Sequence, residues 1–70
     1  MSYLIVIEKT RTGFSAYSPD LPGCAATGST RKEVEERMGE AIEFHIEGMR
    51  QEGCAVPPPG AYSTYVEVPA

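Results

Sequence analysis

The sequence predicts an α+β fold in which one long helix packs on one face of a small, mainly antiparallel sheet, in the order β-β-β-α-β. Two observations support this prediction. Short runs of β-branched and aromatic residues, separated by glycine and proline turns, fill residues 3–28 and recur at residues 62–68. Between them, residues 31–52 carry apolar side chains at the three- and four-residue spacing of an amphipathic helix, with no interrupting proline.

Three strands are expected before the helix. Residues 3–9 are apolar on both faces, which is typical of a strand that is buried on both sides. Residues 10–13 read as a hairpin loop in which Gly13 is free to adopt a positive φ angle, and residues 14–18 alternate as the return strand. Pro19 and Pro22 then interrupt regular structure, and residues 24–28 form a short third strand that is weakened by its alanines.

Capping signals mark both ends of the helix. Thr30 and Glu33 form a capping box, in which side chains and backbone N–H groups satisfy each other. Gly53 stands where a left-handed C-terminal cap is expected, so the helix is predicted over residues 31–52. Three consecutive prolines at 57–59 prevent its continuation and make a stiff, extended connector to a last strand over residues 62–68.

The predicted helix has one apolar face and one acidic face. At about 100° per residue, the apolar side chains gather in a single stripe, which Phe44 and Ile46 flank on either side. The members of the stripe are Val34, Met38, Ala41, Ile42, His45 and Met49. The opposite face carries Glu36, Glu40, Glu43 and Glu47. We interpret these four carboxylates mainly as solvated surface, and alternatively as an acidic docking face for a basic partner.

Length and charge restrict the class of protein. Seventy residues suffice for a single domain, residues 1–70, whose marginal stability would gain from self-association. The net charge of -4 argues against direct nucleic-acid binding, which depends on neutralising phosphates with Lys and Arg. No apolar run has the ~18 residues of a membrane span. No secretory signal precedes the first strand, so we expect a cytoplasmic protein with Cys24 and Cys54 reduced.

One face of the predicted sheet lacks a cover. A single helix packs on one face only, yet the first strand carries Leu4 and Val6 on the other. We therefore expect a second copy of the chain to cover this open face, giving a homodimer or a tetramer. The residues expected at an interface with a partner or with another subunit are Leu4, Val6, Tyr17, Asp20, Leu21 and Tyr65.

The candidate reactive residues do not combine into a catalytic or metal site. His45 is the only histidine and has no nucleophile or orienting group beside it, so we interpret it as a partly buried structural residue or a pH-sensitive interface residue. Asp20 is interpreted as a turn residue. Cys24 and Cys54 lack the basic neighbours in sequence that would lower a thiol pKa. We therefore predict no catalytic residue, no metal and no cofactor, since the common nucleotide and zinc motifs are also absent.

Three segments occur in an order that is known from one protein family. Residues 13–30 combine an aromatic strand, the motif Pro-Asp-Leu-Pro-Gly-Cys and a small-residue strand that ends in Gly-Ser-Thr before the helix. Residues 41–49 and the prolines at 57–59 follow as the helix end and its exit. In this combination, residues 3–68 resemble the HicB-like antitoxins.

The resemblance implies a protein-binding function. HicB antitoxins have an N-terminal domain with a partial ribonuclease-H-like fold, β-β-β-α-β, which lacks the acidic catalytic set of true nucleases. This domain neutralises HicA, a small basic mRNA-cleaving toxin, by covering its RNA-facing surface. Family members usually add a C-terminal DNA-binding domain and form dimers or tetramers. Because this sequence ends at Ala70, direct DNA contact is not expected.

Three functions are compared on this basis. The favoured one is a non-catalytic protein-binding module that neutralises a HicA-type toxin. The alternative is a stand-alone oligomeric HicB-like domain with a structural or ligand-binding role and no toxin partner. Nuclease activity is disfavoured because only Glu8 and Asp20 are acidic within the first three strands and their loops, whereas such chemistry needs clustered carboxylates.

Overall fold

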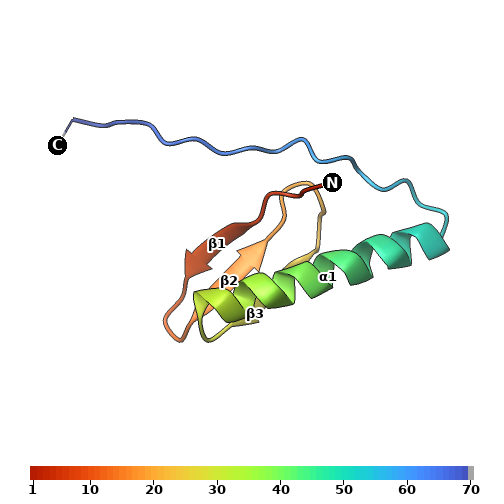
Figure 1. Ribbon diagram of the computed structural model, residues 1–70, viewed down its shortest axis with the longest axis horizontal. Coiled ribbons are helices and arrows are strands. Elements are labelled where there is room, and N and C mark those ends of the chain that lie inside the picture. Colours follow the sequence, from red (N-terminus) through yellow and green to blue (C-terminus); the bar gives the residue numbers. More distant parts are fainter. Residues whose placement is uncertain (70) are drawn as a thin grey trace.

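The computed structural model of the protein describes residues 1–69. Its elements are β1 (Val6–Lys9), β2 (Phe14–Tyr17), β3 (Ala25–Gly28) and α1 (Arg31–Gln51), followed by a long C-terminal segment (Figure 1). The predicted α+β class, with three antiparallel strands followed by one long helix, is confirmed.

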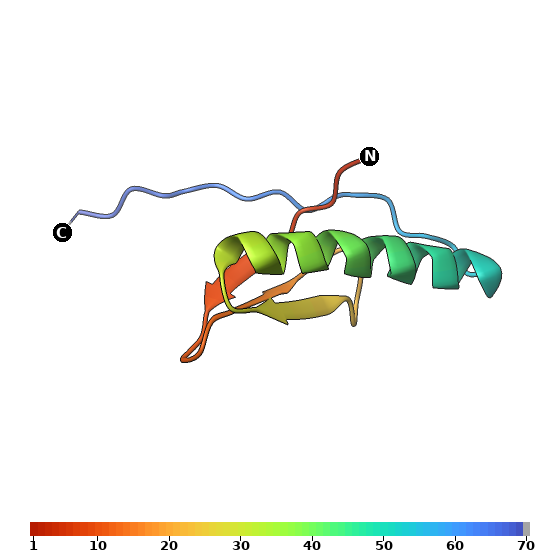
Figure 2. The same ribbon diagram turned by 60° about the horizontal axis from the view of Figure 1, so that its bottom comes forward.

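The three strands form an antiparallel sheet in the order β1-β2-β3. Ile7 pairs with Ala16, and Ala16 pairs with Ala26, so these three side chains form a row on one face. Ala16 is 3% exposed and Ile7 and Ala26 pack against the core, which identifies this face as the one that α1 covers. Figure 2 shows α1 lying along this face, while the opposite face of the sheet stays uncovered.

The first strand is shorter than predicted. Residues 3–5 lie before β1, although Tyr3 and Ile5 still pack against the core as the alternation requires. The backbone carbonyl of Leu4 accepts a hydrogen bond of 3.1 Å from the Ser18 hydroxyl, which itself is buried. The Ser18 side chain therefore replaces the backbone N–H group that would bond the Leu4 carbonyl in a continuous strand pair.

The helix begins with the predicted cap at Thr30, but the reciprocal bond of the capping box goes to the residue before it. The Thr30 hydroxyl accepts a hydrogen bond of 3.1 Å from the Glu33 backbone nitrogen, and the Glu33 carboxylate accepts one of 2.8 Å from the Ser29 backbone nitrogen. At the other end, Gly53 has φ 73°, the left-handed conformation that was expected there. Val34 and Met38 are fully buried and join Ala16, Leu21 and Cys24 in the core.

Two glycines stand where backbone segments approach each other closely. A Cβ on Gly28 would lie 2.8 Å from the Val34 backbone nitrogen, in the first turn of α1. The expectation of a positive φ at Gly13 is wrong, because only Gly23 and Gly53 have positive φ among the described residues. Gly13 is needed for space instead, since a Cβ there would overlap the Gly28 carbonyl oxygen.

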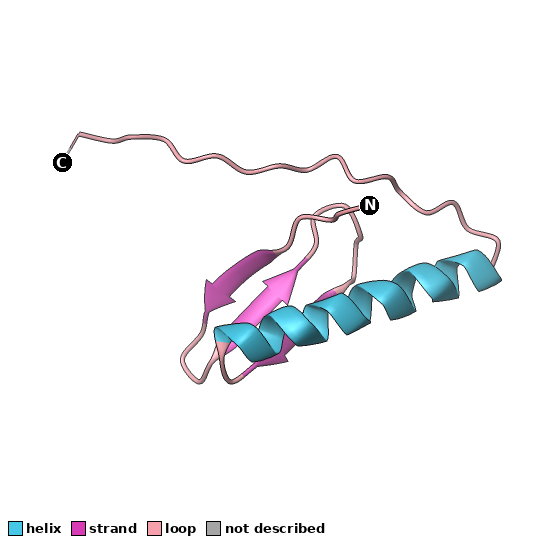
Figure 3. Cartoon of the chain, in the orientation of Figure 1, coloured by secondary structure: helices cyan, strands magenta, loops and turns pink. Residues whose placement is uncertain are grey.

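The predicted last strand does not form. Residues 62–68 are extended but belong to no strand in the described chain, and they run clear of the sheet (Figures 1 and 3). A strand exists only where a neighbour accepts and donates its backbone hydrogen bonds, and none lies beside this segment within residues 1–69. The prediction was wrong for the single chain because strand propensity does not supply that neighbour.

Candidate protein-docking site

The acidic, histidine and cysteine side chains are scattered over the described chain. Within residues 1–69, no three His, Cys, Asp or Glu side chains are placed to hold a metal ion. None of the described helices has the length and apolar character to cross a membrane.

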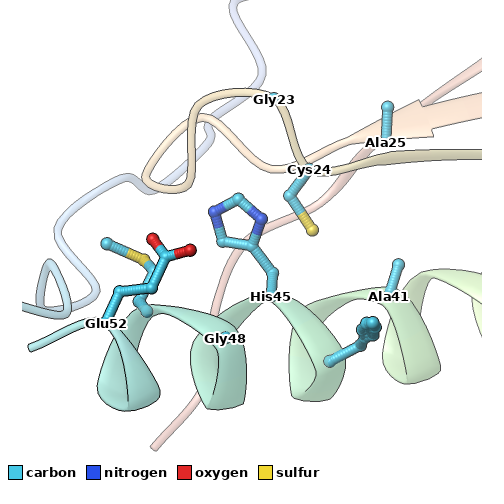
Figure 4. A pocket seen from close by; sticks show the side chains of 9 residues that line it. Gly23, Cys24, Ala25, Ala41, His45, Gly48 and Glu52 are labelled. Atoms are coloured by element: carbon cyan, nitrogen blue, oxygen red, sulfur yellow. The ribbon is translucent and has the colours of Figure 1, made fainter. Parts of the chain in front are cut away.

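A groove of about 540 Å³ runs between α1 and the start of β3. The segment at Gly23 and Cys24 forms one wall, and the C-terminal half of α1 forms the other (Figure 4). Small residues line it, namely Gly23, Ala25, Ala41 and Gly48. Because these side chains are short, the groove is open. Its lining is largely apolar, and Phe44, His45, Met49 and Glu52 also contribute to it.

Phe44 lies at the outer margin of this groove. Its side chain is 69% exposed, although it stands in the middle of α1. Phe44 also borders a second hollow, of about 230 Å³, with Glu47, Gly48 and Gln51. The helical pattern placed Phe44 only beside the core stripe, so its exposure was not predicted. One feature of the sequence does indicate this exposure: Phe44 follows Glu40 by four residues, so the two side chains are only about 40° apart around the helix.

The four carboxylates of the acidic face continue from Phe44 around the helix. Glu36, Glu40, Glu43 and Glu47 are all exposed. The ion pairs on the helix in the described chain join Arg31 to Glu35 and Arg37 to Glu33, so neither includes these four. We call Phe44 with Glu36, Glu40, Glu43 and Glu47 the Phe44 surface.

His45 and Cys24 face each other across the groove in Figure 4. His45 is half-buried and makes no hydrogen bond through its ring to any other residue of the described part of the chain. Cys24 is 4% exposed, and this burial raises the pKa of its thiol above the ordinary value. A raised pKa disfavours the thiolate, so Cys24 is suited to packing rather than to nucleophilic chemistry.

The predicted interface residues fall into three places. Val6 and Tyr17 are paired in the ladder and lie on the uncovered face of the sheet, where Tyr17 is 46% exposed. Leu4, half-buried, leads into the same face. Tyr65 is fully exposed in the C-terminal segment. Leu21 is 1% exposed and lies in the core, so its side chain has no free surface in this conformation.

Asp20 holds the C-terminal segment to the body. One oxygen of its carboxylate accepts hydrogen bonds from the backbone nitrogens of Gly60, at 3.2 Å, and Ala61, at 3.1 Å. The Tyr3 hydroxyl donates a further hydrogen bond to the Pro57 carbonyl. The interpretation of Asp20 as a turn residue is thus incomplete, because its hydrogen-bond donors lie in the connector after the helix.

Comparison with known proteins agrees with this architecture. The model of a family described as the HicB-like antitoxin of bacterial toxin–antitoxin systems matches residues 3–70. The chain belongs to the HicB-like antitoxin family. An uncharacterised 14.9 kDa protein of Haemophilus phage HP1 is 39% identical over 69 residues, which cover 99% of this chain. The match covers only 52% of that phage protein, so this chain spans about half its length.

This HicB-like chain also resembles an archaeal protein and a chain of known structure. A UPF0150 protein of Thermoplasma acidophilum is 34% identical over 58 residues and is matched over 84% of its length, against 81% of this chain. A chain of the solved HicA3 and HicB3 toxin–antitoxin complex superposes with a TM-score of 0.74 at 40% identity. That superposition covers 84% of this chain and 70% of the solved one. The fold therefore occurs in a protein that is found in complex with a toxin.

Proposed function

We propose that this HicB-like chain is a non-catalytic cytoplasmic binding module that neutralises a small basic HicA-type mRNA-cleaving toxin by covering its RNA-facing surface. The family match and the likeness to a chain of a toxin–antitoxin complex support this proposal. The observation that carries it for this chain is the Phe44 surface, an exposed aromatic side chain beside a row of carboxylates.

The composition of the Phe44 surface suits such a partner. Most of the binding energy of a protein interface comes from a few buried anchors, and large aromatic side chains are prominent among them. Phe44 is 69% exposed and adjoins open hollows on both sides, so a partner has room to enclose it. Removing this ring from water on binding would contribute about 2 kcal/mol.

The carboxylates provide the selectivity for a basic partner. A toxin that binds RNA presents lysines and arginines on its RNA-facing surface, since phosphate neutralisation dominates RNA affinity. Glu36, Glu40, Glu43 and Glu47 imitate that row of negative charge along about three turns of helix. Complementary charge raises the association rate and orients the partner, while salt weakens both effects.

The proposal is tested by calorimetry with the HicA-family toxins encoded in the source genome, each in a catalytically inactive form. One of them is expected to bind, more weakly as salt increases. Glu40→Gln with Glu47→Gln should weaken binding about tenfold, whereas Glu8→Gln with Glu35→Gln, which removes the same charge elsewhere, should change it less than about threefold. Equal effects of the two double variants would show that net charge, and not this surface, governs binding.

A further inference from the structure

We propose that the groove beside Phe44 is a socket for an apolar side chain of the basic toxin, and that His45 admits this side chain only while its imidazole is neutral. Acid then weakens the complex. This inference rests on the proposed function, because the occupant is the toxin, but it gives the groove a role that the Phe44 surface does not require. The groove is the hollow of about 540 Å³ between α1 and the start of β3.

The groove is continuous with the Phe44 surface. Phe44 lines it, so a partner that encloses this ring also covers the mouth of the groove. Gly23, Ala25 and Gly48 leave the space between the two walls unfilled, because their side chains are short or absent. A side chain that enters this space gains about 25 cal/mol for each Å² of apolar surface that it removes from water. The described residues that line the groove include no Lys or Arg, so the lining suits a basic partner.

His45 is a polar group of this groove without a neighbouring charge on its own helix. Its ring faces Cys24 across the groove in Figure 4. The residues three and four positions before and after it, which adjoin it on the surface of a helix, are all uncharged. They are Ala41, Ile42, Gly48 and Met49. No adjacent turn of α1 therefore supplies a carboxylate that would hold a proton on the ring.

Two further titratable groups line the groove. The Cys24 thiol stands on the opposite wall, and burial raises its pKa, so it stays neutral at neutral and acid pH. The Glu52 carboxylate lies seven positions after His45, at the C-terminal cap of α1. The ion pairs of the described chain do not include Glu52. Histidine is the side chain whose charge ordinarily changes between about pH 5 and about pH 8, so His45 is the group that switches here.

Protonation of His45 opposes binding in two ways. When the toxin covers the groove, the ring loses its water, and this desolvation costs the imidazolium more than the neutral imidazole. The imidazolium also repels a partner whose contact surface is basic. Affinity for the toxin is therefore full above the titration range of histidine and falls as the pH falls through that range.

A groove-filling variant tests the socket. Gly48→Leu places a side chain in the groove, and the helix has room for it, because a Cβ at Gly48 meets nothing within 4 Å. Gly39→Leu is the matched control, since a Cβ at Gly39 is equally free and Gly39 does not line the groove. Calorimetry with inactive toxin at about pH 7.5 should show binding weakened at least about tenfold by Gly48→Leu and less than about threefold by Gly39→Leu.

A pH series tests the role of His45. Between about pH 7.5 and about pH 5.5, toxin affinity should fall about tenfold with the wild type and less than about twofold with His45→Gln, which keeps a polar side chain but does not titrate. Groups of the toxin titrate in both series, so the difference between the series belongs to His45. Glu52→Gln should keep the slope of the wild type.

The outcomes separate this inference from the proposed function. If the toxin binds the wild type but Gly48→Leu and Gly39→Leu bind it alike, the socket is overturned while the proposed function stands. If His45→Gln keeps the wild-type slope, or Glu52→Gln alone loses it, the role of His45 is overturned. If no HicA-type toxin of the source genome binds the wild type at either pH, both proposals fail.

Discussion

The Asp20 carboxylate lies 3.1 Å from the backbone nitrogen of Ala61, across 41 positions of sequence. With the neighbouring bond to Gly60, this contact ties the turn before β3 to the connector after α1. The connector is thereby held against the turn between β2 and β3. Asp20 thus determines where the C-terminal segment leaves the body.

Asp20→Ala should release the connector. The amides of Gly60 and Ala61 lose their acceptor, so their hydrogen exchange should accelerate by about tenfold, as measured by NMR. The free energy of unfolding should fall by about 1 kcal/mol, because the bonds are partly exposed to water. Asp20→Asn keeps an acceptor oxygen and should give a smaller effect. Unchanged exchange at both amides in Asp20→Ala would show that the contact does not hold the connector.

Gly28→Ala should destabilise the fold by about 1–3 kcal/mol, because the new Cβ would lie 2.8 Å from the Val34 backbone nitrogen and push β3 away from α1. Gly39→Ala is the matched control within the helix, where a Cβ meets nothing within 4 Å. Alanine favours helix over glycine, so Gly39→Ala should stabilise by about 0.5–1 kcal/mol. Urea denaturation distinguishes the two. Equal effects of the same sign would contradict the close approach at Gly28.

Thr30→Ala should cost about 1 kcal/mol in unfolding free energy, since it removes the acceptor for the Glu33 backbone nitrogen at the start of α1. Ser29→Ala is the control, because Ser29 takes part in the capping box through its backbone nitrogen only. Its thermal midpoint should stay within about 1 °C of the wild type. If Ser29→Ala lowered the unfolding free energy more than Thr30→Ala, Thr30 would not be the residue that caps α1.

Stability should fall at alkaline pH through Cys24. Burial raises the pKa of its thiol above 9.0, so the folded state favours the protonated form. The resulting stabilisation is fully present below pH 9.0 and is lost as the pH rises through the higher folded-state pKa. Unfolding free energies between about pH 8 and about pH 10 should therefore fall more steeply in wild type than in Cys24→Ala. Cys54→Ala, which alters an exposed thiol, should keep the wild-type slope.

Local chemistry was sufficient to predict the helix. The Thr30 cap and Gly53 act within a few residues of the helix ends, and both were found where the sequence placed them. The order of the strands was also predictable from alternation and turn residues. Residues 3–5 were overassigned because the Ser18 hydroxyl, distant in sequence, binds the Leu4 carbonyl.

Properties that depend on distant neighbours were not predictable in the same way. The strand expected at residues 62–68 has suitable side chains, but it lacks a paired edge in the single chain. Phe44 sits near the border of the apolar stripe, and its 69% exposure depends on which distant residues pack against that side of α1. Helical periodicity gives the angle of a side chain and not the width of the surface that covers it.

The most direct test of the proposed function is the inhibition of RNA cleavage. An active HicA-type toxin of the source genome should lose its cleavage of mRNA in proportion to added chain, with full inhibition near stoichiometric amounts. Phe44→Ser should weaken inhibition about 30-fold, as expected for a central aromatic anchor, while Tyr17→Ser on the uncovered sheet face should change it less than about threefold. Undiminished cleavage by every such toxin, or full inhibition by Phe44→Ser with loss in Tyr17→Ser, would contradict the proposal.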